Sequence, residues 1–145
     1  MLTDTAKILL NMSWQKRVAA LLKAAERANS TIEVTHPESF DACRLALDKC
    51  KGWLNGMVTS PEVLAAYLDS DEAENPWMQE SKFKNDSRGL NALIFITMVI
   101  GHIAYLAYEH EGKSKEMSET ISEAGSTIFE SMAEYGEPYG LSGLV

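Results

Sequence analysis

The sequence is that of an acidic globular chain. It has 145 residues, of which 46% are hydrophobic and 23% are charged, proportions that exclude a disordered chain. The formal net charge of −8 is divided unevenly: residues 1–58 carry eight Lys/Arg and six Asp/Glu, whereas residues 59–145 carry five and fifteen. This excess of negative charge disfavours binding to nucleic acid or anionic lipid and favours a basic protein partner, although solubility alone would also explain it.

The first part of the chain predicts two helices followed by a linker. The first helix is expected to begin after Thr3 or Asp4, since both side chains can accept hydrogen bonds from the first helical turn. A joint at residues 11–13 leads into a second helix, whose apolar residues recur three and four positions apart. Residues 31–35 contain β-branched side chains but have no second strand to pair with, so we expect an extended linker there.

Proline marks the start of the next two predicted helices. Pro37 and Pro61 suit the first helical turn, where the N–H that proline lacks is not needed. Residues 69–76 are typical of a loop, and they contain four carboxylates and no Lys or Arg. After this loop, Trp77 and Phe83 predict a short helix or turn that folds back onto the domain.

The longest uncharged stretch of the chain covers residues 90–108. Its apolar residues face all directions of a helix, which predicts a helix that is buried on every side. The stretch is also about as long as a membrane span, which needs roughly 20 apolar residues. Asn91 and His102 lie within it, however, and no basic cluster flanks it, so we expect a core helix and no membrane. Gly101 is expected to let a neighbouring helix approach closely.

The last predicted helix covers residues 115–135, and the tail after Gly136 is expected to be irregular. Together these elements predict one all-α domain spanning residues 1–145. The expected architecture is a compact bundle of about five to seven helices around the central helix near residues 90–108.

The sequence contains no constellation that indicates an enzyme or a cofactor site. The nucleophile-elbow, dinucleotide-binding and phosphate-binding glycine motifs are all missing from it. Cys43 and Cys50 are seven residues apart on a predicted helix, about 10 Å, which is too far for a disulfide and favours reduced core thiols. A metal site would have to use His102, Glu109 and His110, whose spacing lacks the close His or Glu repeats of helical metal sites.

Two groups of carboxylates are the candidate partner-binding residues. The first group would lie along one stripe of the last predicted helix, where repulsion between like charges costs a few tenths of a kcal/mol per pair. It consists of Glu116, Glu119, Glu123, Glu130 and Glu134. The second group lies in the acidic loop and consists of Asp69, Asp71, Glu72 and Glu74.

The pattern as a whole resembles the all-helical immunity proteins of bacterial polymorphic-toxin systems, in particular the immunity family numbered six. The features that carry the likeness are Trp14 in an early helix, Ala46-Leu47-Asp48 followed by Trp53, Ser60-Pro61-Glu62 with Tyr67-Leu68, and Ala104-Tyr105-Leu106-Ala107-Tyr108-Glu109. The resemblance implies a cytoplasmic protein that binds a cognate toxin domain and blocks it. It carries over no contact residues, because each interface is matched to its own toxin.

The leading hypothesis is therefore an immunity protein that neutralises a toxin domain by stoichiometric binding through its acidic surface. A basic toxin that acts on nucleic acid would suit this charge. Two alternatives stay open: a helical interaction or scaffold protein, monomeric or homodimeric, and a small enzyme or metal-binding bundle. No cofactor and no nucleic-acid partner are expected.

Overall fold

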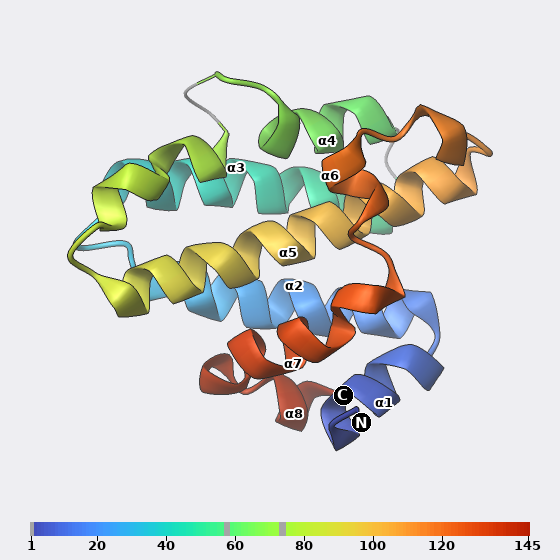
Figure 1. Ribbon diagram of the computed structural model, residues 1–145, viewed down its shortest axis with the longest axis horizontal. Helices are drawn as coiled ribbons and strands as arrows, with labels where there is room; N and C mark the ends of the chain where they lie inside the picture. Colours follow the sequence, from blue (N-terminus) through green and yellow to red (C-terminus); the bar gives the residue numbers. More distant parts are fainter. Residues whose placement is uncertain (1, 57–58, 73–74) are drawn as a thin grey trace.

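The computed structural model describes residues 2–56, 59–72 and 75–145, and all regular structure within these ranges is helical (Figure 1). Helices account for 78% of the chain, which confirms the all-α prediction, but they are more numerous than the predicted five to seven. The α-helices are α1 (Asp4–Asn11), α2 (Trp14–Ser30), α3 (Pro37–Leu54), α4 (Pro61–Asp69), α5 (Ser87–His110), α6 (Glu119–Ser122), α7 (Phe129–Gly136) and α8 (Leu141–Leu144). The 3-10 helices are η1 (Pro76–Phe83), η2 (Ser114–Glu116), η3 (Ser126–Ile128) and η4 (Glu137–Tyr139).

Helix α5 is the centre of the molecule. It crosses the middle of Figure 1, with α3 and α4 on one side and α2 and α7 on the other, and it packs against all four of these helices. Most of its residues are buried. The prediction of burial on every side holds only in part, because one face, with Leu90, Ile94, Thr97 and Met98, is half-buried. By length and composition this one helix could cross a membrane, but 67% of its most apolar window is buried inside the protein. The burial is that of a core helix in a soluble protein.

Local capping explains where several helices begin. The hydroxyl groups of Thr3, Ser13 and Ser60 accept hydrogen bonds from the N–H groups of the first turns of α1, α2 and α4. The carboxylate of Asp86 does the same for α5, accepting from Gly89 N at 2.9 Å. Proline occupies the first position of both α3 and α4, which confirms the predicted starts.

The predicted extended linker at residues 31–35 is wrong. These residues form turns that continue from α2, with Thr31 N donating to Ala28 O at 3.1 Å and Ile32 N donating to Asn29 O at 3.1 Å. Ile32 is 1% exposed and belongs to the hydrophobic core. Burial of this one apolar side chain therefore favours a compact turn over an extended segment.

The continuous helix predicted over residues 115–135 is also wrong. The backbone is extended at Met117, and the hydroxyl of Ser118 then caps a new helix by accepting from Ile121 N at 3.2 Å. It is extended again at Gly125, where an added Cβ would lie 3.0 Å from the Tyr105 ring. The chain breaks because a helix through these points would lose the cap and the close packing. The tail after Gly136, expected to be irregular, forms η4 and α8.

Candidate partner-binding surface

The break in the last predicted helix divides the predicted stripe of five glutamates. Glu116 lies in η2 and Glu119 in α6, and α6 packs against α4 and α5. Glu130 and Glu134 lie in α7, which packs against α1 and α2 on the other side of α5 (Figure 1). The prediction that these carboxylates follow one helical stripe is therefore wrong.

Glu130 has a partner inside the protein. Its carboxylate accepts a hydrogen bond from Thr3 N at 2.9 Å and a longer one from Thr3 Oγ1 at 3.4 Å. Thr3 is also the N-cap of α1. The side chain that the sequence placed in the partner-binding set thus joins α7 to the beginning of α1.

Carboxylates from both predicted groups act on Tyr108 near the end of α5, where α4 and η2 pack against this helix. Burial, followed by the negative charges of Glu62, Asp69 and Glu116, raises the pKa of Tyr108 above its usual value. Lys113 adds a positive charge and forms an ion pair with Glu62, with Nζ 3.0 Å from Oε1. We call Glu62, Asp69, Glu116 and Lys113 the acidic corner.

Glu62 is not among the predicted partner-binding residues, because it stands in the Ser60-Pro61-Glu62 helix start. A signal was present: Glu62 and Asp69 are seven residues apart, which places both carboxylates on one face of α4. No such signal predicts that Glu116 lies near Glu62 and Asp69, because its position depends on how η2 packs against α5.

The other carboxylates of the predicted acidic loop lie next to this corner along the chain. Asp71 and Glu72 follow α4 and are exposed, whereas Glu74 lies outside the described residues. Glu72 also lines a hollow of about 270 Å³ along α4, together with Val63 and Ser70. The acidic loop therefore extends the corner beyond the end of α4.

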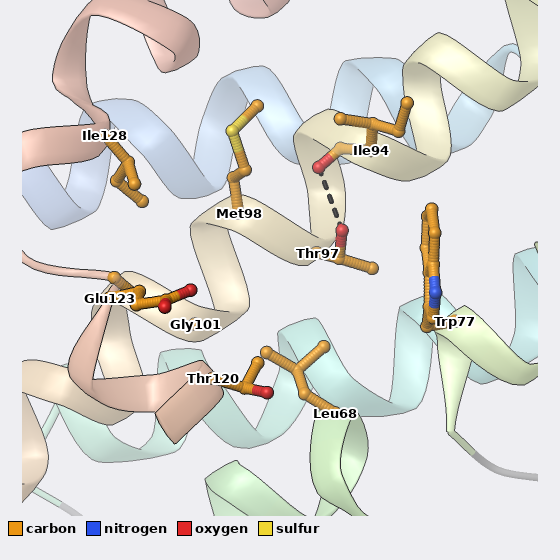
Figure 2. A pocket seen from close by; sticks show the side chains of 10 residues that line it. Leu68, Trp77, Ile94, Thr97, Met98, Gly101, Thr120, Glu123 and Ile128 are labelled. Carbon is orange, nitrogen blue, oxygen red and sulfur yellow. Dashed lines mark hydrogen bonds between the residues drawn. The ribbon is translucent and has the colours of Figure 1, made fainter. Parts of the chain in front are cut away.

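A second, larger groove lies between α5, α6, η1 and the end of α4. Its volume is about 390 Å³, and Figure 2 shows Trp77 at one end and Glu123 at the other. The wall between them is mainly apolar and is formed by Leu68, Ile94, Met98 and Ile128. Among the described residues that line the groove, Glu123 is the one with a charge. Sequence reasoning missed this groove because its walls come from five separate elements.

Gly101 forms part of the groove at the point where α4 and α6 approach α5. A Cβ at this position would lie 3.3 Å from both Leu68 Cδ1 and Ala124 Cβ, which is closer than ordinary packing allows. The prediction that Gly101 permits a close approach is therefore confirmed. The missing side chain also leaves room in the groove.

The two histidines considered for a metal site have other partners. His102 is 2% exposed, and its Nδ1 lies 2.9 Å from Ala124 O. His110 Nδ1 lies 2.8 Å from Leu106 O, and its ring packs edge-on against Trp14 and Trp53. Within residues 2–56, 59–72 and 75–145, no three His, Cys, Asp or Glu side chains are arranged to hold a metal ion.

The two cysteines of α3 are free and buried. Burial raises the pKa of the Cys43 thiol to about 12 and moves that of Cys50 in the same direction. Both thiols are therefore protonated at neutral pH, which is unfavourable for a nucleophile.

The described residues thus form an all-helical scaffold with a carboxylate-rich surface, a class of architecture suited to binding another protein. A family model described as immunity protein Imm6 matches residues 16–137, so the chain belongs to the Imm6 family of immunity proteins. The match includes the whole acidic corner and the groove. No curated protein and no solved structure matches the chain. Family membership makes this protein an immunity protein for a toxin, and it implies an inhibitor with a protein partner rather than an enzyme.

Proposed function

We propose that this protein neutralises its cognate toxin domain in the cytoplasm by stoichiometric binding, and that it binds through a surface containing the acidic corner, Asp71, Glu72 and the exposed side of α6. The observation that carries the proposal is the packing of α4 and η2 against α5, through which Asp69 and Glu116, one carboxylate from each predicted group, both act on Tyr108. The toxin surface that fits it is basic, as in domains that act on nucleic acid.

The charges on this surface are largely uncompensated. From Glu116 to the C-terminus the chain has six Asp/Glu and no Lys or Arg. Among the described residues, Lys113 pairs with Glu62 and Glu111, while Asp69, Asp71, Glu72, Glu119 and Glu123 have no ion pair. Unpaired carboxylates in water attract a basic partner at long range. Their charge is also available to form ion pairs with that partner.

This mode of binding has a kinetic signature. Electrostatic attraction accelerates association by about 10- to 1000-fold and loses strength as salt is added. By occupying the basic surface that holds nucleic acid, the inhibitor would exclude the substrate without any chemical step. The proposed inhibition is therefore fast, salt-sensitive and stoichiometric.

The first test is expression of the toxin domain encoded beside this protein, with and without it. We expect toxicity from the toxin alone, normal growth with both proteins, and co-purification at equal stoichiometry. Normal growth of cells that express the neighbouring protein alone would contradict the proposal. Light scattering of the immunity protein by itself would identify a homodimer, which is one form of the scaffold alternative.

The second test compares two triple variants that remove the same charge. Asp69→Asn/Glu116→Gln/Glu119→Gln changes the proposed surface, and Glu33→Gln/Asp41→Asn/Asp48→Asn changes exposed carboxylates elsewhere. We expect the first to slow association at low salt by about tenfold or more and to reduce its salt dependence, and the second to have a much smaller effect. Equal effects of the two variants would show that net charge matters and this surface does not.

A further inference from the structure

The groove between Trp77 and Glu123 has features that the proposed function does not use. Trp77 is 42% exposed and Met78, beside it, is 51% exposed. Large aromatic side chains at the surface are enriched in protein interfaces, where they become buried against a partner. A volume of about 390 Å³ is near the lower end of the roughly 300–1,000 Å³ of ligand pockets, so it suits one or two side chains rather than a helix.

We propose that this groove receives one cationic side chain of the toxin, an arginine or a lysine, and that Glu123 binds its charged end. The proposal rests on the proposed function, because it takes the occupant to be part of the toxin. It adds a specific anchoring site to the acidic surface.

The chemistry of the two ends of the groove supports a cation. The alkyl part of an arginine or lysine would pack on Ile94, Met98 and Ile128, as long charged side chains do when they cover apolar surface. Its charged end would reach the carboxylate of Glu123, which has no ion pair among the described residues. The ring of Trp77, at the opposite end of the groove from Glu123, would cover the alkyl part of the same side chain.

An uncharged occupant fits the groove less well. An aliphatic or aromatic side chain would cover the apolar wall but would leave the charge of Glu123, an exposed residue, without a partner. The groove is also continuous with the proposed binding surface: Leu68 directly precedes Asp69 of the acidic corner, and Glu123 directly follows α6, which begins at Glu119. Charge complementarity and position therefore favour the same basic partner.

The test measures binding of the neighbouring toxin domain to full-length variants. Glu123→Gln keeps the shape of the side chain and removes its charge, and Glu134→Gln on α7 is the matched control that lies outside the groove. We expect Glu123→Gln to raise Kd at least tenfold, mainly through faster dissociation, and Glu134→Gln to change it less than threefold. Trp77→Ala, which removes an exposed ring, is expected to weaken binding by a similar factor to Glu123→Gln.

A double-mutant cycle identifies the occupant. Each arginine and lysine of the toxin is replaced by methionine in turn. For one of these toxin variants, we expect nearly equal Kd values for the unmodified immunity protein and for Glu123→Gln. Equal Kd values for Glu123→Gln and Glu134→Gln, or no coupled cation on the toxin, would overturn the proposal. Weakening by Trp77→Ala alone would also overturn it, since that result indicates an apolar occupant. If the unmodified protein fails to bind the toxin, the proposed function itself is contradicted.

Discussion

Arg17 and His102 form a buried hydrogen bond, in which Arg17 Nε donates to His102 Nε2 at 3.1 Å. Because Nε2 accepts, the ring proton lies on Nδ1, which donates to Ala124 O at 2.9 Å. The other end of the guanidinium donates to Leu9 O at 3.2 Å and to Met12 O at 3.4 Å. This pair therefore joins α1, α2, α5 and the segment after α6 by hydrogen bonds.

Replacement of Arg17 by lysine should destabilise the protein. An ammonium group cannot reproduce the planar arrangement of donors that contacts His102, Leu9 and Met12 together, and buried acceptors would be left unpaired. We expect the free energy of unfolding, measured by urea denaturation, to fall by about 1–3 kcal/mol. Lys16→Arg, an exposed neighbour, serves as the control and should change it by less than about 0.5 kcal/mol. Equal midpoints for the two variants would argue against the network.

The burial of His102 should make stability depend on pH. Burial, followed by the nearby charge of Arg17, lowers the pKa of His102 to about 4. An unfolded chain takes up this proton near pH 6.5, whereas the folded protein does not until about pH 4, so acid favours unfolding between these values. His102 thus stabilises the fold above pH 6.5, and about 3 kcal/mol of the unfolding free energy is lost as the pH falls to about 4.

Urea denaturation at several pH values checks this expectation. His102→Gln keeps a polar side chain but removes the titration, so its stability should fall less steeply over the same pH range. Carboxylates that titrate in this range contribute equally to both proteins, and the difference between the two curves isolates His102. Parallel curves would show that its pKa is not lowered.

Glu130→Ala should loosen α1. The variant removes the acceptor for Thr3 N, and with it the hydrogen bond that joins the start of α1 to α7. We expect a loss of about 1 kcal/mol in stability, as for other helix caps, and faster amide hydrogen exchange in α1. Glu134→Ala on the same helix is the control, and it should leave α1 unchanged. Identical exchange in both variants would exclude a stabilising role for Glu130.

Gly136→Ala should destabilise the contact between α7 and α5. An added Cβ would lie 2.7 Å from both Leu141 Cδ2 and Phe95 Cε1, and these buried side chains have little room to move. Overpacking of this kind costs about 1–3 kcal/mol, measurable as a lower Tm. The control is Gly143→Ala, since an added Cβ there has no atom within 4 Å. An unchanged Tm for Gly136→Ala would show that α7 can shift away from α5.

Part of the fold could be predicted because its causes are local. Residues 90–108 indicate a central helix since their apolar side chains face every direction, and α5 is central and mostly buried, with one half-buried face. Pro37 and Pro61 mark helix starts through the missing N–H, which acts within one turn. The resemblance to immunity proteins, which the Imm6 match confirms, likewise rests on the order of residues along the chain.

The end of the chain depends on contacts between distant residues. The apolar spacing of residues 115–135 is compatible with one helix, and Ser118 and Gly125 are acceptable within it. The packing of Gly125 against the Tyr105 ring favours a broken chain instead. Because of this break, Glu130 in α7 accepts a hydrogen bond from the start of α1, and Glu116 lies where its charge acts on Tyr108 together with that of Asp69.

The sequence by itself determined the helical class, the central helix, the excess of acidic residues and the family. Tertiary structure alone decided which carboxylates lie together and that Glu123 faces an apolar groove. The physical reason is the distance along the chain over which each interaction acts. Helical periodicity and capping act over a few residues. Asp69 and Glu116 are 47 positions apart, and only the packing of α4 and η2 against α5 lets both act on Tyr108.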